Sequence, residues 1–401
     1  MGLLPVEQAL AMLWEHTPGP DREGLSWHHA LGRVLLEPAL SLLDDPAFDR
    51  SSMDGYSLKA AGTHEGSRLP VTATILAGQC PSRPLELGGA VKVMTGAPIP
   101  SGADAVAPVE DCRESGGFVE LIRPVRPGEN IRYRGENLRA GETVFYPGRR
   151  LDALDVATGI ALGIERAAVA RRPSATILAT GSELVEPGTS PGPGLIPNSN
   201  GPMLASLWRG WGGRLAGETC VPDGEEELEA AIRRGLESDY LVLSGGVSVG
   251  ERDLVPELLG RAGVRRIFHK VAMKPGKPIY FGRREDTVVL GLPGNPVSSF
   301  VGALLFLQSS LHKRMGLPPL AWRTRHLAER HESGGGRTRF EPAVPVDGGG
   351  VNLLRHMGSA DLPAWRGAEA LVELPAGRAV FEAGSPLRVL LFRHLGRETG
   401  A

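Results

Sequence analysis

The chain has 401 residues, which is too long for one ordinary domain and predicts roughly two to four of them. Its composition, 41% hydrophobic and 22% charged, is typical of a globular protein, and a net charge of −2 argues against a general nucleic-acid binder. No apolar run could span a bilayer, the N-terminus lacks the basic region of a signal peptide, and the three cysteines form neither a disulfide framework nor a zinc motif. We therefore expect a cytoplasmic protein with no nucleic-acid or membrane partner.

The N-terminal part of the chain has two different patterns. Apolar residues at helical spacing predict a short helix over 5–15, and a second helix is expected over 25–36. A polar loop rich in acidic residues follows at 44–56. Beyond it, short apolar runs separated by glycine and proline predict a β-rich region over 58–150, in the form of a small barrel or sandwich.

From residue 175 strands and helices alternate. Strand-like runs at 175–179, 215–221 and 240–243 are separated by helical segments, and Asp223 with an acid three residues later is typical of a capping box. This alternation predicts a parallel sheet covered by helices on both faces. After a proline break at 317–319, residues 323–395 return to short strands, which predicts a separate small β domain.

Two strands of the α/β region end in glycine loops, and a lysine-rich turn lies between them in the sequence. The loops are Ser244 to Gly250 and Pro293 to Ser298, and the turn is Lys274-Pro275-Gly276-Lys277. Ligands of open α/β sheets bind outside the carboxyl ends of the strands, where glycine lets backbone N–H groups approach an anion. Lysines supply the opposite charge. The pattern predicts a pocket for a phosphorylated or oxyanionic ligand.

Six motifs taken together resemble the molybdopterin molybdenumtransferases, the MoeA family, which includes the gephyrin E domain. They occur in the family's order at 48–56, 94–98, 180–184, 244–253, 274–278 and 291–298. The resemblance implies a multidomain α/β plus β protein. Its parts are an N-terminal elongated region (1–172) with an inserted β-rich domain (about 46–146), a three-layer α/β molybdopterin-binding domain (173–318) and a C-terminal small β-barrel (322–398).

The resemblance also implies the reaction. Adenylylated molybdopterin and molybdate are the expected substrates, AMP and molybdenum cofactor the products, and Mg²⁺ the supporting ion. The expected assembly is a homodimer with composite active sites, in which Asp54 and Thr95 face the α/β domain of the partner. The related enzyme that adenylylates molybdopterin typically has Gly-Gly-Thr-Gly where this chain has Gly245-Gly246-Val247-Ser248, which favours metal insertion.

Motif by motif, the resemblance assigns roles to particular residues. The catalytic candidates are Asp54, Thr95, Glu183, Asp253, Lys270 and Lys274. The substrate-binding candidates are Ser244, Gly245, Gly246, Ser248, Lys277, Pro293, Gly294, Asn295, Pro296, Ser298, Arg337 and Ser359. The metal candidates are Glu183, Asp223 and Asp253. Lys, Arg, hydroxyl and backbone N–H groups are the ligands that a tetrahedral dianion such as molybdate requires.

Simpler roles are open for several of these residues. Asp54 could cap a turn, Asp223 and Asp253 could cap helices, and the lysines could belong to a solvated surface. The chain also departs from the family at Asn137, where the usual residue is Asp. Two other functions compete with metal insertion: a nucleotide pyrophosphatase or amidase on the same α/β domain, and a scaffold protein.

Overall fold

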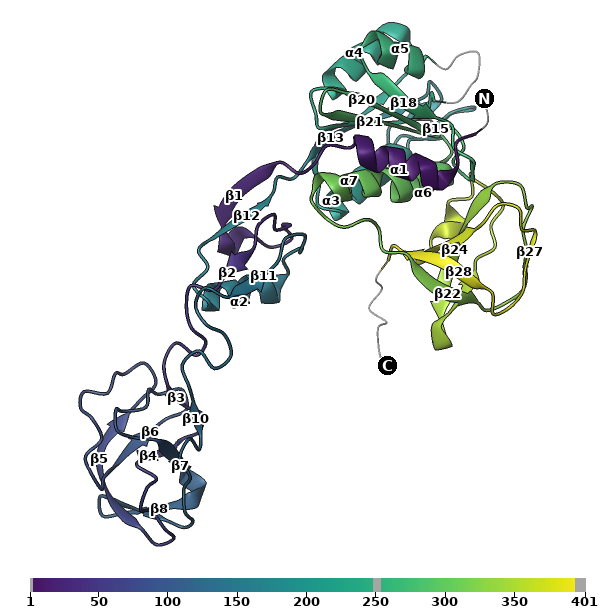
Figure 1. The fold of residues 1–401 in the computed structure, drawn as a ribbon. Coiled ribbons are helices and arrows are strands. Elements are labelled where there is room, and N and C mark those ends of the chain that lie inside the picture. The colour runs from purple at the N-terminus through teal and green to yellow at the C-terminus, as the bar shows by residue number, and fades with distance from the viewer. Residues whose placement is uncertain (1–2, 248–253, 394–401) are drawn as a thin grey trace.

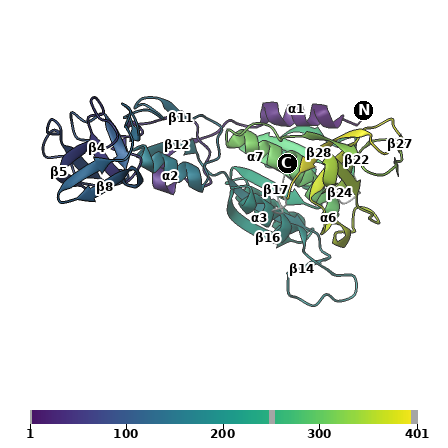
Figure 2. The same ribbon diagram turned by 90° about the horizontal axis from the view of Figure 1, so that it is seen from below.

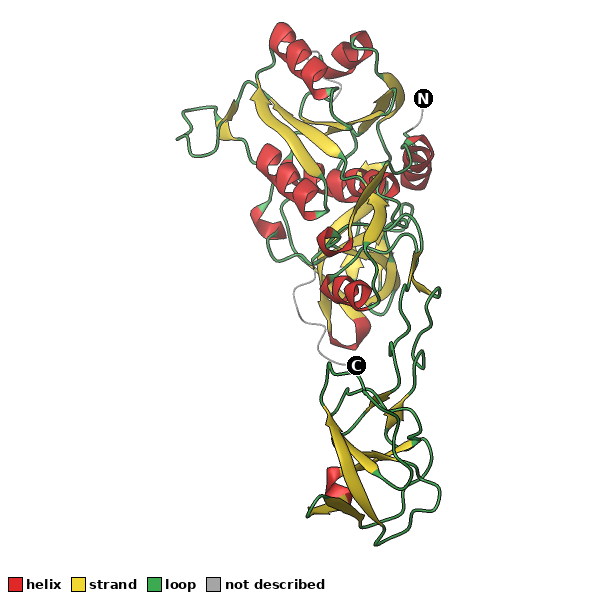
Figure 3. Ribbon diagram, turned by 90° about the vertical axis from the view of Figure 1, so that its left-hand side faces the viewer, coloured by secondary structure: helices red, strands yellow, loops and turns green. Residues whose placement is uncertain are grey.

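The computed structural model describes residues 3–247 and 254–393 of the chain. The molecule is long and bent (Figure 1). The chain begins against the α/β unit, runs out to a β-rich unit at the far end, returns through a small connecting unit, and ends in a β-barrel beside the α/β unit. Figure 3 shows the helices gathered mainly around the α/β unit, with strands dominating the two β units. Among the described residues, no helix combines the length and apolar character needed to cross a membrane.

A six-stranded sheet in the order β16-β13-β17-β21-β20-β18 forms the centre of the α/β unit. Its strands are β13 (Ser174–Thr180), β16 (Arg214–Val221), β17 (Tyr240–Ser244), β18 (Arg265–His269), β20 (Tyr280–Arg284) and β21 (Thr287–Leu292). The first four strands in this order are parallel, as expected, but β20 and β18 are antiparallel to their neighbours, so the prediction of a parallel sheet was wrong at one edge. Only Glu285 and Asp286 separate β20 from β21, and a two-residue turn can join only antiparallel strands.

Helices cover both faces of this sheet and give the three expected layers. They are α1 (Val6–His16), α3 (Asn200–Gly210), α4 (Glu225–Gly235), α5 (Val255–Arg261), α6 (Pro296–Gly302), the π-helical η3 (Ala303–Leu307) and α7 (Gln308–Arg314). One apolar core joins α1, α3, α6 and α7 to the sheet, and a second joins α4 and α5 to the other face (Figure 1). Helix α1 therefore packs with the α/β unit although the chain then leaves it.

The connecting unit consists of short paired segments around the buried Trp27. Its elements are β1 (Arg22–Ser26), η1 (Trp27–His29), β2 (Ala39–Leu40), β11 (Thr143–Phe145), α2 (Ala153–Ala161) and β12 (Arg166–Ala170). The helix expected over 25–36 is absent. That segment forms one 3-10 turn and then reaches Gly32, whose φ of 71° lies in the left-handed region and interrupts a helix.

The distal unit is β-rich, as predicted. Six of its strands form one sheet in the order β7-β4-β6-β5-β9-β8, and β10 pairs with β3. The elements are β3 (Arg50–Ser51), β4 (Gly55–Leu58), β5 (Arg68–Ile75), β6 (Ala90–Val93), β7 (Ala105–Pro108), η2 (Val109–Asp111), β8 (Cys112–Ser115), β9 (Phe118–Leu121) and β10 (Ile131–Arg132).

Five strands of the C-terminal unit close into a barrel in the order β24-β25-β22-β28-β26 and back to β24. The unit contains β22 (Arg323–Leu327), β23 (His331–Glu332), β24 (Thr338–Val346), η4 (Asp347–Gly349), β25 (Gly350–Leu353), η5 (Pro363–Trp365), β26 (Ala370–Leu374), β27 (Val380–Phe381) and β28 (Pro386–Leu391). Strand β19 (Met273–Lys274) of the α/β unit pairs with β24, so the lysine-rich turn lies where the two units meet.

Candidate functional site

A cavity of about 660 Å³ lies at the carboxyl ends of the parallel strands. We call it the strand-end cavity. Its lining includes the expected substrate-binding residues Ser244, Gly245, Gly246, Pro293, Gly294, Asn295 and Pro296. The short strands β14 (Leu184–Val185) and β15 (Ile196–Pro197) border it, and the loop between them projects from the body of the molecule (Figure 2). A cavity of this size suits a ligand as large as a nucleotide.

The glycine loops around this cavity are packed closely against one another. A Cβ at Gly245 would collide with the carbonyl oxygen of Thr180, so only glycine fits at the end of β17. The buried side chain of Asn200 joins the loops, because its Nδ2 donates to Ser244 Oγ at 2.9 Å and to the Gly294 carbonyl at 2.7 Å. Asn200 thus ties the end of β17 to the loop that follows β21. Sequence reasoning missed Asn200, whose position at the start of a helix after a polar loop was its one signal.

Glu183 and Asp223 both line the strand-end cavity. Asp223 does not cap α4 as the sequence suggested, because Gly224 is the N-cap residue and the helix begins at Glu225. Asp223 instead exchanges two hydrogen bonds with Ser182. Its Oδ2 accepts from the Ser182 N–H at 3.1 Å, and its own N–H donates to Ser182 Oγ at 3.1 Å. Glu183 and Asp223 both affect the Cys220 thiol. Burial raises the pKa of this thiol, and the negative charges of Glu186, Glu183 and Asp223 raise it further.

Two candidates of the same motif, Ser248 and Asp253, lie outside the described residues. Within the described ranges no group of three or more His, Cys, Asp or Glu side chains could hold a metal ion. Two exposed carboxylates nevertheless suit Mg²⁺, which usually takes one or two carboxylates and completes its shell with water and substrate phosphates. Glu183 and Asp223 therefore fit the expected ion, provided that a phosphorylated ligand occupies the cavity.

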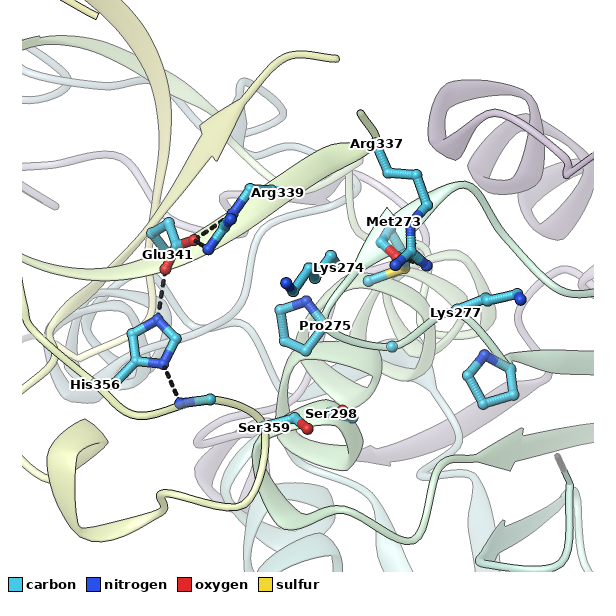
Figure 4. Close-up of a pocket in the computed structure, with 13 residues that line it drawn as sticks. Met273, Lys274, Pro275, Lys277, Ser298, Arg337, Arg339, Glu341, His356 and Ser359 are labelled. Carbon is cyan, nitrogen blue, oxygen red and sulfur yellow. Dashed lines mark hydrogen bonds and ion pairs between the residues drawn. The ribbon is translucent and has the colours of Figure 1, made fainter. Parts of the chain in front are cut away.

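A second cavity of about 280 Å³ lies between the α/β unit and the barrel (Figure 4). We call it the lysine cavity. Lys274, Lys277 and Ser298 come from the α/β unit, while Arg337 and Ser359 come from the barrel. All five were predicted substrate-binding or catalytic residues, and the fold brings them together from separate parts of the chain. Pro278 lines both cavities, so a ligand in one would lie beside a ligand in the other.

The lysine cavity has unneutralised positive charge. Among the described residues, no ion pair or hydrogen bond is formed by the side-chain ammonium group of Lys274 or of Lys277. Arg337 donates to the carbonyl of Met273 at 3.1 Å, which orients its guanidinium without neutralising it. Several cations around a small cavity produce a positive potential that attracts a compact anion. Two hydroxyls, those of Ser298 and Ser359, are available to donate hydrogen bonds to its oxygens.

The barrel is fixed to the α/β unit at this point. Asn295 Nδ2 donates to Ser359 Oγ at 3.0 Å, and the Val297 N–H donates to the Ser359 carbonyl at 3.2 Å.

The sequence predicted only some of the barrel residues that line the lysine cavity. Arg337, Arg339 and Glu341 alternate with Thr338 and Phe340, which is the period of a strand with one charged face, yet only Arg337 was predicted.

Lys270 has a different position from the other lysines. It follows β18 with a φ of 73°, and its N–H donates to the Ile279 carbonyl at 2.9 Å. It lines neither the strand-end cavity nor the lysine cavity. The structure therefore gives no geometric support to a catalytic role for Lys270 within one chain.

Asp54 and Thr95 meet in the distal unit. The backbone N–H of Thr95 and its hydroxyl donate to the same oxygen, Asp54 Oδ1, at 2.6 and 2.7 Å. These bonds, the backbone one foremost, hold the pKa of the Asp54 carboxyl below its usual value. The unit that carries them lies at the opposite end of the molecule from the α/β unit (Figure 1). One chain does not bring Asp54 into either cavity.

The substituted position Asn137 lies near this unit. Its Nδ2 donates to Asp45 Oδ2 at 2.9 Å, and its Oδ1 accepts from Arg132 at 3.2 Å. The amide thus bridges a carboxylate and a guanidinium. An aspartate at position 137 would place a second negative charge beside Asp45, whereas the asparagine amide donates a hydrogen bond to it. This contact explains why asparagine suits the position.

Comparison with known proteins covers almost the whole chain. Three family models match: "MoeA N-terminal region (domain I and II)" at 4–163, "Probable molybdopterin binding domain" at 176–313 and "MoeA C-terminal region (domain IV)" at 324–392. The chain is 33% identical over 374 residues to molybdopterin molybdenumtransferase 2 of Mycobacterium tuberculosis, which covers 90% of this chain and 92% of that protein. The chain belongs to the molybdopterin molybdenumtransferase family.

Further relatives agree with this assignment. The molybdopterin molybdenumtransferase of Bacillus subtilis is 31% identical over 405 residues, with 97% of this chain and 94% of that protein covered. The crystal structure of a MoeA protein of molybdopterin biosynthesis from Pyrococcus horikoshii matches with a TM-score of 0.85 and 29% identity, over 98% of this chain and all of that one. The predicted fold class is confirmed, as is the prediction that the chain belongs to a family of transferases.

Proposed function

We propose that this chain is a molybdopterin molybdenumtransferase that inserts molybdenum from molybdate into molybdopterin during molybdenum cofactor biosynthesis. The observation that carries the proposal is that Pro278 lines both cavities, so the two are neighbours. The strand-end cavity has the size and glycine loops for a large phosphorylated ligand, and the lysine cavity has the size and charge for an oxyanion. The pyrophosphatase and scaffold alternatives give no reason for a lysine cavity completed by the barrel.

The substrate that enters the strand-end cavity is adenylylated molybdopterin in this proposal. The glycine loops offer backbone N–H groups to its phosphates, while Lys274 and Lys277 attract molybdate into the adjoining cavity. Ser298 and Ser359 donate hydrogen bonds to the molybdate oxygens and orient the ion. Release of AMP accompanies metal insertion, because the adenylyl group leaves as the phosphoanhydride is hydrolysed.

Mg²⁺ is the proposed supporting ion. Glu183 and Asp223 would hold it, and the ion would neutralise charge on the phosphoanhydride. The protein's own contribution is to hold Asp223 through its paired hydrogen bonds with Ser182, the residue that precedes Glu183 in the chain. Asp253 remains a third candidate ligand from the sequence.

We also propose a homodimer with composite sites. Asp54 and Thr95 lie too far along the molecule to reach the cavities of their own chain, whereas a two-fold partner could present them there (Figure 1). The connecting unit supports this, because it exposes many large apolar side chains for its size. They are Leu31, Leu40, Leu42, Leu43, Tyr146, Leu154 and Ile160. A second copy of the chain is the partner that would cover them.

The experiment that separates metal insertion from general hydrolysis compares substrates. AMP release is measured from adenylylated molybdopterin, ATP and ADP-ribose, each with and without molybdate and Mg²⁺. We expect AMP to be released from adenylylated molybdopterin but not from ATP or ADP-ribose. This release should occur only when molybdate and Mg²⁺ are both present. Equal release from all three compounds without molybdate would support a pyrophosphatase instead.

A further inference from the structure

A chain of hydrogen bonds runs through the barrel wall behind the lysine cavity (Figure 4). Its centre is Glu341 on β24, a carboxylate that is only 4% exposed. Glu341 Oε1 accepts from Arg339 Nε at 2.8 Å, and Oε2 lies 2.6 Å from His356 Nε2. Both carboxylate oxygens are therefore engaged by groups that themselves line the cavity. A buried carboxylate with two such partners is held in one orientation.

The two ring nitrogens of His356 have different tasks. The backbone N–H of Gly358 donates to Nδ1 at 3.2 Å, and because an N–H can only donate, Nδ1 accepts. The ring proton then lies on Nε2 and is donated to Glu341 Oε2. This arrangement requires the neutral imidazole in a single tautomer, which the two neighbours select together.

Each end of this series of hydrogen bonds carries a group that lines the lysine cavity. One end is the guanidinium of Arg339. The other is the segment after His356, which carries Ser359 and fastens it to Asn295 and Val297 of the α/β unit. Glu341 is a poor ligand for molybdate, since like charges repel. Its two bonds instead set the spacing between an arginine on β24 and a serine on the neighbouring loop.

We propose that Glu341 and His356 are positioning residues of the lysine cavity, which fix Arg339 and the Ser359 loop at the separation that a tetrahedral oxyanion requires. This inference rests on the proposed function and deepens it, since it names what shapes the molybdate site. Groups that orient the ligands of a bound metal ion change its affinity by about 10- to 100-fold, and we expect an effect at the lower end of that range for an oxyanion.

A matched pair of substitutions tests the two bonds of His356 separately. In His356→Asn the amide oxygen takes the place of Nδ1, so the Gly358 bond is kept and the Glu341 bond is lost. In His356→Gln the amide nitrogen takes the place of Nε2, so the Glu341 bond is kept and the Gly358 bond is lost. Titration calorimetry with sodium molybdate alone should show about tenfold weaker binding by each variant, equivalent to about 1.4 kcal/mol.

A third variant tests the tautomer. In Glu341→Gln the amide oxygen can still accept from Arg339, but its NH₂ then faces His356 Nε2 and forces the ring proton onto Nδ1, against the Gly358 N–H. We expect molybdate affinity to fall as it does in the histidine variants. In turnover, all three should raise KM for molybdate while KM for adenylylated molybdopterin and kcat at saturating molybdate stay near wild type. A purely structural defect would change all three constants.

His326→Asn, at an exposed position on β22 of the same barrel, is the control and should bind molybdate like the wild type. Thermal unfolding shows whether each variant is folded. Wild-type affinity for molybdate in both folded histidine variants would overturn the proposal, and so would a wild-type protein that binds no molybdate. A wild type that binds molybdate but does not release AMP would contradict the proposed function and leave the positioning role standing, because binding is measured without turnover.

Discussion

Lys274 and Arg339 are register partners in the parallel strand pair that joins the α/β unit to the barrel. Two cations placed opposite each other on neighbouring strands destabilise a sheet unless something neutralises them. Glu341 forms an ion pair with Arg339, but no described residue forms an ion pair with the side chain of Lys274. An anion bound between the two units would supply the missing charge, and it would also explain why the barrel is attached at this strand.

Removal of the unpaired lysines should affect molybdate use far more than stability. Lys274→Ala and Lys277→Ala each remove one cation from the lysine cavity, whereas an exposed side chain rarely contributes more than about 0.5 kcal/mol to folding. We expect a large rise in KM for molybdate with a nearly unchanged melting temperature. Lys313→Ala on α7, away from both cavities, is the control for loss of one positive charge. Normal turnover of both variants at limiting molybdate would mean that the lysines belong to a solvated surface.

Two inactive variants should complement each other if the active sites are composite. Asp54→Ala damages the distal unit and Glu183→Ala the strand-end cavity. Each homodimer should be nearly inactive. After random subunit exchange about half of the dimers are mixed, and each mixed dimer has one intact site, so activity should recover to about one quarter of wild type. Proven exchange with no recovery would place both residues in a site formed by one chain.

The Asp54–Thr95 contact predicts a shift that nuclear magnetic resonance can measure. The folded-state pKa of Asp54 is lowered by the backbone N–H of Thr95 first and by its hydroxyl second. A lowered pKa stabilises the folded chain above the unfolded value, and the contribution is lost as pH falls through the folded value. Thr95→Val removes the hydroxyl and keeps the N–H, so the pKa of Asp54 should rise part of the way back. An unchanged pKa would mean that the hydroxyl does not bind the carboxylate in solution.

Asp239 should stabilise the junction between the connecting and α/β units. Burial alone would raise the pKa of its carboxyl, but hydrogen bonds from Arg171 and from the N–H and hydroxyl of Ser174 hold that pKa well below its usual value. Its stabilisation is present above the unfolded pKa and is lost as pH falls through the folded one. Asp239→Asn should lower the free energy of unfolding by about 1–3 kcal/mol at pH 7.

The comparison variant for Asp239 is Asp286→Asn, whose carboxylate is 82% exposed and pairs with Arg283. An exposed pair contributes between about 0 and 1 kcal/mol, so chemical denaturation should detect little change. If the two variants have equal unfolding free energies, the Asp239 network is not a stabilising junction.

The sequence predicted those parts of the site that are built from short motifs. Paired glycines after β17 and the lysine turn before β20 could be read directly, because glycine and a turn have local physical causes. Asp223 was misjudged as a helix cap because a capping pattern does not reveal that Ser182, from another loop, already occupies the carboxylate.

Other features depend on which strands pair and in which register. Glu341 and His356 are 15 residues apart and meet because β24 and β25 pair as an antiparallel hairpin, whose register brings Glu341 beside the residues that follow β25. The antiparallel edge of the α/β sheet follows from the two-residue turn between β20 and β21, a hairpin within a region where strands and helices otherwise alternate. The helix predicted over 25–36 did not form, although its apolar residues have helical spacing. The pairing of β1 with β12 and the left-handed conformation of Gly32 favour an extended path instead.

Reconstitution of the reaction is the most direct test of metal insertion by this chain. Purified protein is incubated with adenylylated molybdopterin, Mg²⁺ and molybdate, and AMP and molybdenum-loaded cofactor are quantified in the same samples. We expect both products to appear in equal amounts, and omission of molybdate to abolish both. Release of AMP at the same rate without molybdate, or AMP with no loaded cofactor, would contradict this expectation.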